Sequence, residues 1–254
     1  MHTVDTIMSK LATFRVHIAP LGFEIDRIVI PLKETKADKL WLLIHEKTAE
    51  DKSGPYLEKI KKECKKLGVK LEISYVDRLS IFKVIKAVKE IILQEKNNYI
   101  YVNVASGSKI QAIACMMACM ILKGCKNIQP FYAEPERYAA FEGKQQSYGI
   151  KDTMPLPIYE IQTPKQKLLE ALRIVNEHKN QKLTKKEMAE IAEERGIITI
   201  ESKLNHSQAR FASLDKNIIE PLEKEWGFIE IEKIGRNRWI KITEEGKNAA
   251  EFLI

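Results

Sequence analysis

Two segments of the sequence carry residue types that could bind an anionic ligand. In the clearer one, the apolar run Tyr99–Val104 is followed by four small residues and a lysine at the start of a helical pattern. Small side chains let a ligand approach the backbone, helix N-terminal amides point outward, and a lysine adds positive charge. The GxxxxGK[ST] spacing of a Walker loop is missing, so a phosphate-binding turn of another kind is predicted. The residues expected to contact the ligand here are Ala105, Ser106, Gly107, Ser108 and Lys109.

The second segment is HIAPLGFEIDR, residues 17–27, where a strand-like run leads through a turn into another helix start. It lacks GxGxxG, which argues against dinucleotide binding. Ligands of open parallel sheets bind beyond the carboxyl ends of the strands, so both turns would line one crevice if the first and fourth strands are neighbours. The expected contacts are Leu21, Gly22 and Phe23. Glu24, Asp26 and Arg27 follow; the acids either suit a helix N-terminus or repel phosphate.

Positive charge also gathers on two segments nearer the C-terminus, the start of a helix near Ser207 and a hairpin around residues 235–237. Acids crowd the helix before them. A recognition helix and a wing are the two elements that a winged helix presents to DNA. The residues expected to contact double-stranded DNA are Lys203, Asn205, His206, Ser207, Gln208, Arg210, Arg236 and Arg238. Surface hairpins also carry arginines without binding DNA, and some helix-turn-helix domains serve only protein contacts.

Alternating apolar and helical patterns over the first 135 residues predict βαβ units and a Rossmann-like parallel sheet. Continuous apolar runs are typical of strands that are buried on both faces. The strands are expected at 15–19, 40–45, 71–76, 99–104 and 128–133, and the helices at 24–34, 55–67, 81–95 and 109–122. Helix 109–122 is apolar nearly all round, so it is either a central core helix or a self-association surface.

Residues 151–164 hold three prolines around a strand-like piece, Leu156–Ile161, and are interpreted as a linker between two domains, 1–150 and 165–254. Capping-box spacing predicts helix starts at Thr163 and Thr184.

A third helix is expected over 207–226, bent or broken near Pro221, followed by a hairpin over 228–243 and a last helix after Thr243. This order is that of a winged helix-turn-helix. The predicted fold is therefore an α/β sensor domain followed by a winged helix-turn-helix domain.

The composition favours two folded units, with 44% hydrophobic residues, a net charge of +7 and Cys64, Cys115, Cys119 and Cys125 without a CxxC pair. Buried reduced thiols are expected rather than a metal site or a disulfide. No apolar run is long enough for a membrane span and no secretory leader is evident, so a cytoplasmic protein without membrane contact is predicted. No Ser/His/Asp set or HExxH motif points to catalysis, and neither a cofactor nor a metal is expected.

The first-strand turn, the "NVASGSK" loop and the C-terminal winged helix together resemble the CARF-domain transcription regulators associated with CRISPR systems, particularly an archaeal branch with a "HIAPLGFEIDRIV" opening. The resemblance covers nearly the whole chain. It implies a homodimer that binds a cyclic oligoadenylate, typically the tetra-adenylate, through the two loops named above. The loop departs from the common form, which has paired glycines and a threonine, because residues 106–109 hold one glycine.

Two alternatives to this regulator remain open. Some CARF domains are similar to ring nucleases that cleave their own ligand, and Ser108, Lys109, His17 or His45 could serve such chemistry. His17 lies within a strand, however, where a core histidine is the simpler interpretation. The other alternative is a regulator that senses a different nucleotide or small molecule.

Overall fold

The computed structural model describes residues 13–47, 51–139, 145–179, 183–200, 205–235 and 237–254. The chain forms two compact units, Met1–Ile161 and Gln162–Ile254, and each is described by itself.

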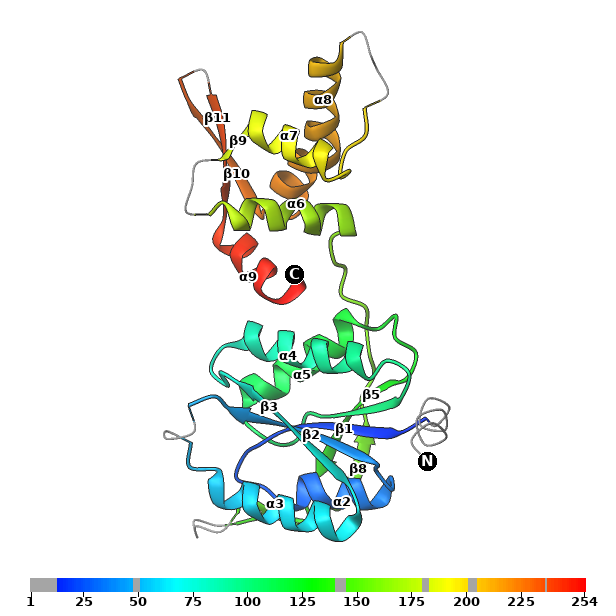
Figure 1. Ribbon diagram of the computed structural model, residues 1–254. Helices are drawn as coiled ribbons and strands as arrows, with labels where there is room; N and C mark the ends of the chain where they lie inside the picture. Colours follow the sequence, from blue (N-terminus) through cyan, green and yellow to red (C-terminus); the bar gives the residue numbers. More distant parts are fainter. Residues whose placement is uncertain (1–12, 48–50, 140–144, 180–182, 201–204, 236) are drawn as a thin grey trace, which may run out of the picture. The chain divides into compact units, whose positions relative to one another are not determined.

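Within the described residues, the first unit is built on a six-stranded sheet with the order β3-β2-β1-β4-β5-β8 (Figure 1). The strands are β1 (Arg15–Pro20), β2 (Lys39–His45), β3 (Lys70–Val76), β4 (Tyr99–Asn103), β5 (Ile128–Glu134) and β8 (Asp152–Pro155). The first five run parallel, and β8 pairs antiparallel with β5 at the edge. The order reverses between β1 and β4, which is the switch point where open α/β sheets bind ligands.

Two helices cover each face of this sheet (Figure 1). Helices α2 (Asp26–Glu34) and α3 (Gly54–Leu67) lie on one face, and α4 (Ile81–Gln94) and α5 (Lys109–Ile121) lie on the other. The central strands are therefore buried on both sides, and Ile18, Leu42 and Val102 are fully buried. This burial on both faces explains the continuous apolar runs of the sequence.

The second unit has the element order of a winged helix domain. Its elements are α6 (Gln166–Glu177), β9 (Leu183–Thr184), α7 (Lys185–Glu194), α8 (His206–Leu214), η2 (Asp215–Ile219), η3 (Pro221–Glu225), β10 (Ile229–Ile234), β11 (Asn237–Ile242) and α9 (Glu244–Leu253). Strands β10, β11 and β9 form one antiparallel sheet. Its core includes Leu172, Met188, Ile218 and Ile240, so the helices and the hairpin share one apolar interior.

Several predicted details of the second half need correction. The capping box at Thr184 is present, with Glu187 reciprocating, but the one at Thr163 is absent because α6 begins at Gln166, after Lys165. The strand-like piece Leu156–Ile161 is irregular, and the strand lies just before it, in β8. The predicted third helix is α8 followed by π-helical segments on either side of Glu220, where Pro221 interrupts the ordinary hydrogen-bond pattern.

The four cysteines are free, and three of them lie in the core as predicted. Burial raises the pKa of Cys64 to about 11, so this thiol stays protonated and unreactive at neutral pH. No helix within the described ranges is long and apolar enough to cross a membrane. No group of three or more potential metal ligands occurs in the part of the chain that the structure describes.

Candidate functional site

The two predicted ligand-binding turns lie next to each other in the first unit. Strand β1 pairs directly with β4, with Ile18 opposite Val102, so the turns that follow these strands leave the same edge of the sheet. A Cβ atom on Gly22 would lie 2.9 Å from the Cα atom of Gly107. The turns therefore touch through two glycine backbones. The sequence predicted one crevice on the condition that these strands are neighbours, and this condition is met.

Gly107 is required by its own conformation as well as by this contact. Its φ angle is +77°, which favours glycine, and a Cβ atom there would lie 2.5 Å from the Cβ atom of Pro20. Any side chain would push the two turns apart.

Asn103, at the end of β4, fixes the shape of the second turn, and the sequence analysis did not single it out. Its Oδ1 atom accepts hydrogen bonds from the amides of Ala105 (2.8 Å) and Ser106 (3.2 Å). The buried Ser106 hydroxyl donates to the carbonyl oxygen of Pro20 at 2.9 Å, which ties the second turn to the first. An asparagine that bonds the amide two residues on is an Asx turn, and this was the available sequence signal.

The exposed part of the second turn begins at Ser108. Ser108 caps α5 in a reciprocal capping box with Gln111, and the Ser108 amide donates to Gln111 Oε1 at 2.9 Å. The amides of Ala105, Ser106 and Ser108 are thus already bonded within the chain. Lys109 is exposed at the first helical position, where amides have no partner inside the helix. An anion would therefore be bound by the Lys109 side chain and the amides beside it.

The first turn presents fewer side chains than the sequence suggested. Leu21 is 3% exposed, belongs to the core, and its amide donates to the Leu43 carbonyl oxygen at 2.9 Å. Phe23 is half-buried, with its ring centroid 5.4 Å from that of Tyr56. Of the three predicted contacts, Leu21 supports the turn from inside, whereas Gly22 and Phe23 reach the surface.

The acidic residues beside this turn are bound within the unit. Arg27 Nη1 lies 3.1 Å from Glu24 Oε1, and Arg27 Nε donates to the Ala133 carbonyl oxygen at 2.9 Å. Burial raises the pKa of Glu24 against the opposing effect of Arg27. Asp26 Oδ2 accepts a hydrogen bond from the Gly149 amide at 2.9 Å. Both carboxylates therefore have partners within the first unit.

The two histidines considered for catalysis are both buried. His17 is 2% exposed, its Nε2 atom lies 2.8 Å from Thr35 Oγ1, and burial lowers its pKa to about 3. His45 is also buried, and its Nδ1 atom accepts from the Arg78 amide at 3.4 Å. His17 is therefore the core histidine that its position in a strand indicated.

In the second unit, the start of α8 is bound to α7 by two of the residues predicted to contact DNA. His206 Nε2 lies 2.8 Å from Glu193 Oε1, and Arg210 Nε lies 3.1 Å from Glu193 Oε2. The two side chains therefore fasten α8 to α7. The remaining predicted residues of this helix start, Asn205, Ser207 and Gln208, are exposed. Lys203 and Arg236 lie outside the described residues.

An open cavity of about 650 Å³ separates the wing from α7. Arg238 and Asn237 line it from β11, and Lys185, Lys186, Glu187 and Glu190 line it from α7. Lys185 is paired with Asp215 at 2.5 Å, whereas Lys186 is exposed. Neither lysine was predicted as a DNA contact, because α7 is rich in glutamate. The pair of lysines directly after the Thr184 cap was the available sequence signal.

Comparison with known proteins agrees with this two-unit architecture. Residues 167–254 match the DUF6293 C-terminal winged helix domain. The second unit is a winged helix domain. Residues 15–138 match the family described as HFX_2341_N-like, N-terminal. The predicted fold, a Rossmann-like parallel-sheet domain followed by a winged helix domain, is confirmed.

Similarity to individual proteins extends over both units. The chain is 29% identical to uncharacterized protein MJ1513 of Methanocaldococcus jannaschii, with 70% of this chain and 61% of that protein covered. The chain thus spans less than two thirds of the length of this relative.

Similar solved structures include Enterococcus italicus Csm6 bound to cyclic hexa-2'-fluoro-hexa-dAMP. The two are 10% identical, the match covers 84% of this chain and 56% of that chain, and the TM-score is 0.44. They also include Can2 from Sulfobacillus thermosulfidooxidans in complex with cyclic tetra-adenylate. The two are 14% identical, the match covers 94% of this chain and 64% of that chain, and the TM-score is 0.41.

Proposed function

We propose that this chain is a ligand-responsive DNA-binding transcriptional regulator that senses a cyclic oligoadenylate, with the tetra-adenylate as the first candidate. The observation that carries the proposal is the backbone contact between Gly22 and Gly107, which joins the two loops of the CARF resemblance at the switch point of the sheet. The winged helix domain supports the DNA-binding part of the proposal, because the usual partner of such domains is double-stranded DNA.

The chemistry of the joined turns suits a polyphosphate with exposed bases. Lys109 and the first amides of α5 attract negative charge, and the neighbouring Glu24 carboxylate is paired with Arg27 rather than free. The half-buried Phe23 ring and the backbone at Gly22 offer apolar surface. Ligand contact is expected from the backbone of the turns and from the side chains of Phe23, Ser108 and Lys109.

A homodimer is proposed because α5 leaves an apolar stripe uncovered in the single chain. This helix buries Ala114, Cys115 and Ala118, yet Ile110 and Ile113 are 38% and 54% exposed beside the ligand turn. Exposed isoleucines three residues apart lie on one helical face, where a second copy would bury them. The two ligand turns would then face each other across the two-fold axis.

The proposed DNA-binding face joins the exposed start of α8 to the cavity beneath the wing. Gln208 and Asn205 are free to reach base edges, and Arg238 and Lys186 are placed to contact phosphates. His206 and Arg210 hold α8 through Glu193 instead. Ligand and DNA would influence each other by changing the separation or orientation of two winged helices.

Calorimetric titration of the full chain with cyclic tri-, tetra- and hexa-adenylate tests the ligand. We expect the tetra-adenylate to bind most tightly and Lys109→Ala to weaken it about tenfold or more, the loss expected when a charged contact to phosphate is removed. Lys123→Ala, an exposed lysine beyond the end of α5, is the matched control and should bind normally. No heat with any ring size, or equal loss in both variants, would reject the proposed sensor.

A further inference from the structure

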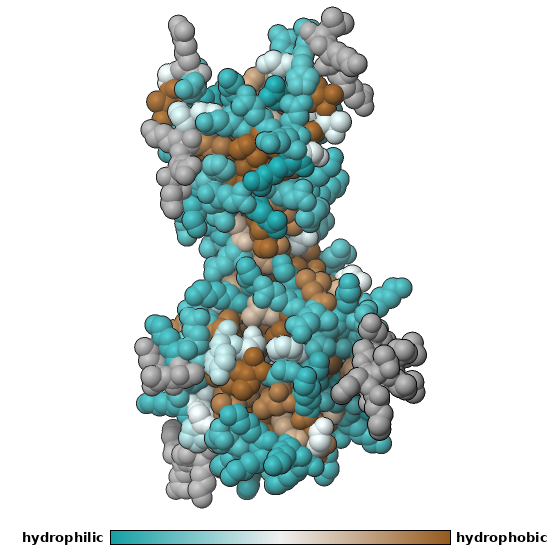
Figure 2. Space-filling view, viewed as in Figure 1, coloured by the Kyte–Doolittle hydropathy of each residue, from teal (hydrophilic) through white to brown (hydrophobic). Residues whose placement is uncertain are grey.

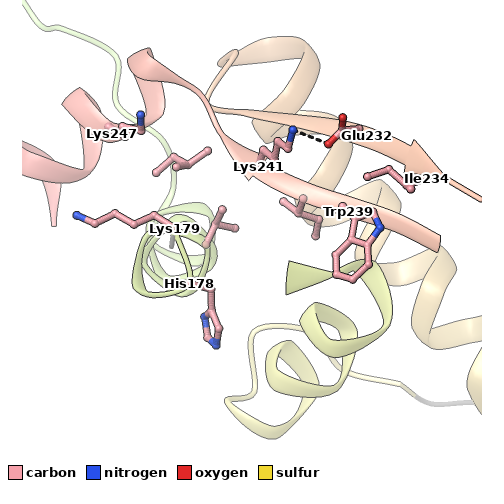
Figure 3. Close-up of a pocket in the computed structure, with 10 residues that line it drawn as sticks. His178, Lys179, Glu232, Ile234, Trp239, Lys241 and Lys247 are labelled. Carbon is pink, nitrogen blue, oxygen red and sulfur yellow. Dashed lines mark ion pairs between the residues drawn. The ribbon is translucent and has the colours of Figure 1, made fainter. Parts of the chain in front are cut away.

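The winged helix domain contains a second cavity that the proposed DNA-binding face does not use. It has a volume of about 300 Å³ and lies between the end of α6, the hairpin and α9 (Figure 3). This volume is at the lower end of the range for small-molecule sites. Its lining residues are Val175, His178, Lys179, Glu232, Ile234, Trp239, Ile240, Lys241, Ile242 and Lys247.

The floor of the cavity is apolar and one wall is aromatic. Ile234 is 47% exposed and, because it pairs with Asn237, lies on the same face of the hairpin as Trp239, so a flat hydrophobic group could rest on it. The half-buried Trp239 indole stands beside this floor (Figure 3). An aromatic side chain stabilises a nucleobase by stacking on it and tolerates any base.

The other side of the cavity is cationic. Lys179 projects from the end of α6, and Lys247 projects from α9 on the same side of the cavity (Figure 3). Lys241 is paired with Glu232 at 2.5 Å and Lys247 with Glu244 at 3.1 Å, whereas no ion pair of the Lys179 side chain occurs among the described residues. These two ion pairs cancel, so Lys179 leaves this side of the cavity with an excess of positive charge, which favours an anion.

The cavity lies away from the proposed phosphate contact of the wing. Successive side chains of a strand point to opposite faces, so Trp239 and Lys241 lie on the face of β11 opposite Arg238. Arg238 lines the other cavity, between the wing and α7. A ligand beside Trp239 would therefore leave the DNA-facing side of the wing accessible.

We infer that this cavity is a binding site for a nucleoside phosphate, with the base on Trp239 and the apolar floor and the phosphates at Lys179 and Lys247. The site is separate from the cyclic oligoadenylate site proposed for the first unit. Its ligand is a single nucleotide, because the cavity is about the size of one. The inference does not depend on whether the chain binds DNA.

ADP is the probe that tests it, with Trp239 as the local reporter. The chain has three tryptophans, so the nuclear magnetic resonance spectrum of the 15N-labelled full chain shows three indole N–H signals, and Trp239→Phe assigns one of them. We expect ADP to move the Trp239 signal with a Kd below about 1 mM. Adenosine alone and inorganic phosphate alone should each bind at least about tenfold more weakly, because each makes only half of the contacts.

A pair of double variants tests the role of the lysines. Lys179→Ala with Lys247→Ala should weaken ADP binding about tenfold or more, while Lys167→Ala with Lys224→Ala removes the same charge from exposed positions outside the cavity and should change nothing. An unmoved Trp239 signal, equal affinity for phosphate alone, or unchanged binding by the Lys179/Lys247 variant would overturn the inference. Binding of cyclic tetra-adenylate by the same variants reports separately on the first unit.

Discussion

His17 makes the stability of the first unit depend on pH in a way that the structure predicts in sign and size. The imidazole lies between Tyr101 and Phe131, with ring centroids at 5.0 and 5.6 Å. Its Nε2 atom lies 2.8 Å from Thr35 Oγ1, and the Thr35 hydroxyl donates to the Pro31 carbonyl oxygen at 2.8 Å. The neutral ring is therefore well accommodated. A protonated ring would place an unpaired charge in an apolar interior.

Burial lowers the pKa of His17 from 6.5 to about 3. Between these two values the unfolded chain binds a proton that the folded chain excludes, so stability decreases as the pH falls and is unaffected above pH 6.5. The full difference corresponds to about 5 kcal/mol, and about 3 kcal/mol of it is lost by pH 4.5. A loss of this size is a large fraction of the stability of an ordinary domain.

The comparison of wild type with His17→Gln isolates this effect, because the amide keeps a donor for Thr35 and carries no charge. Hydrogen exchange of the β1 amides at pH 7 and pH 4.5 gives the opening free energy of the first unit in each protein. We expect wild type to lose about 3 kcal/mol more than the variant. Equal losses, or a His17 ring signal that titrates near pH 6.5 in the folded protein, would show that the folded unit does not exclude the proton.

Three further predictions concern the site, the dimer and the wing. Gly107→Ala combines a left-handed φ with a clash against Pro20, so calorimetry should show ligand affinity reduced about tenfold or more in a chain that still folds. If the chain forms the proposed dimer, Ile113→Glu should convert it to a monomer in sedimentation velocity runs, whereas Tyr75→Glu, at a comparably exposed edge position, should not. Arg238→Ala should weaken DNA binding for all sequences and lower the salt slope by about one in gel-shift titrations; an unchanged slope would remove Arg238 from the interface.

The strands of the first unit could be predicted from the sequence because their burial on both faces appears directly as apolar runs. The runs at 15–19 and 40–45 became β1 and β2 to within one residue at each end. The edge strand β8 could not be predicted, because Asp152–Pro155 has no strand pattern of its own and is held by pairing with β5. Its position is a tertiary effect that overrides local propensity.

In the candidate sites, too, local residue types could be predicted from the sequence, whereas contacts between distant segments could not. The glycine of the second turn is readable from composition, whereas its contact with Gly22 depends on which strands are neighbours. His206 and Arg210 were predicted to contact DNA because they begin a helix, yet in the structure both face Glu193 of α7. The pairing depends on how two helices pack, which no local pattern in the sequence reports. Figure 2 shows that hydrophilic residues cover much of the visible surface of the second unit, so hydrophilic character alone does not single out a DNA-binding face there.

The proposed regulator is tested most directly by measuring DNA affinity with and without saturating cyclic tetra-adenylate at one fixed salt concentration. The proposal predicts that the Kd for DNA changes by about fivefold or more, in either direction, and that DNA changes the Kd for the ligand by the same factor. Identical DNA affinity in the presence and absence of a bound ligand would contradict it, because a sensor that does not alter its output domain regulates nothing.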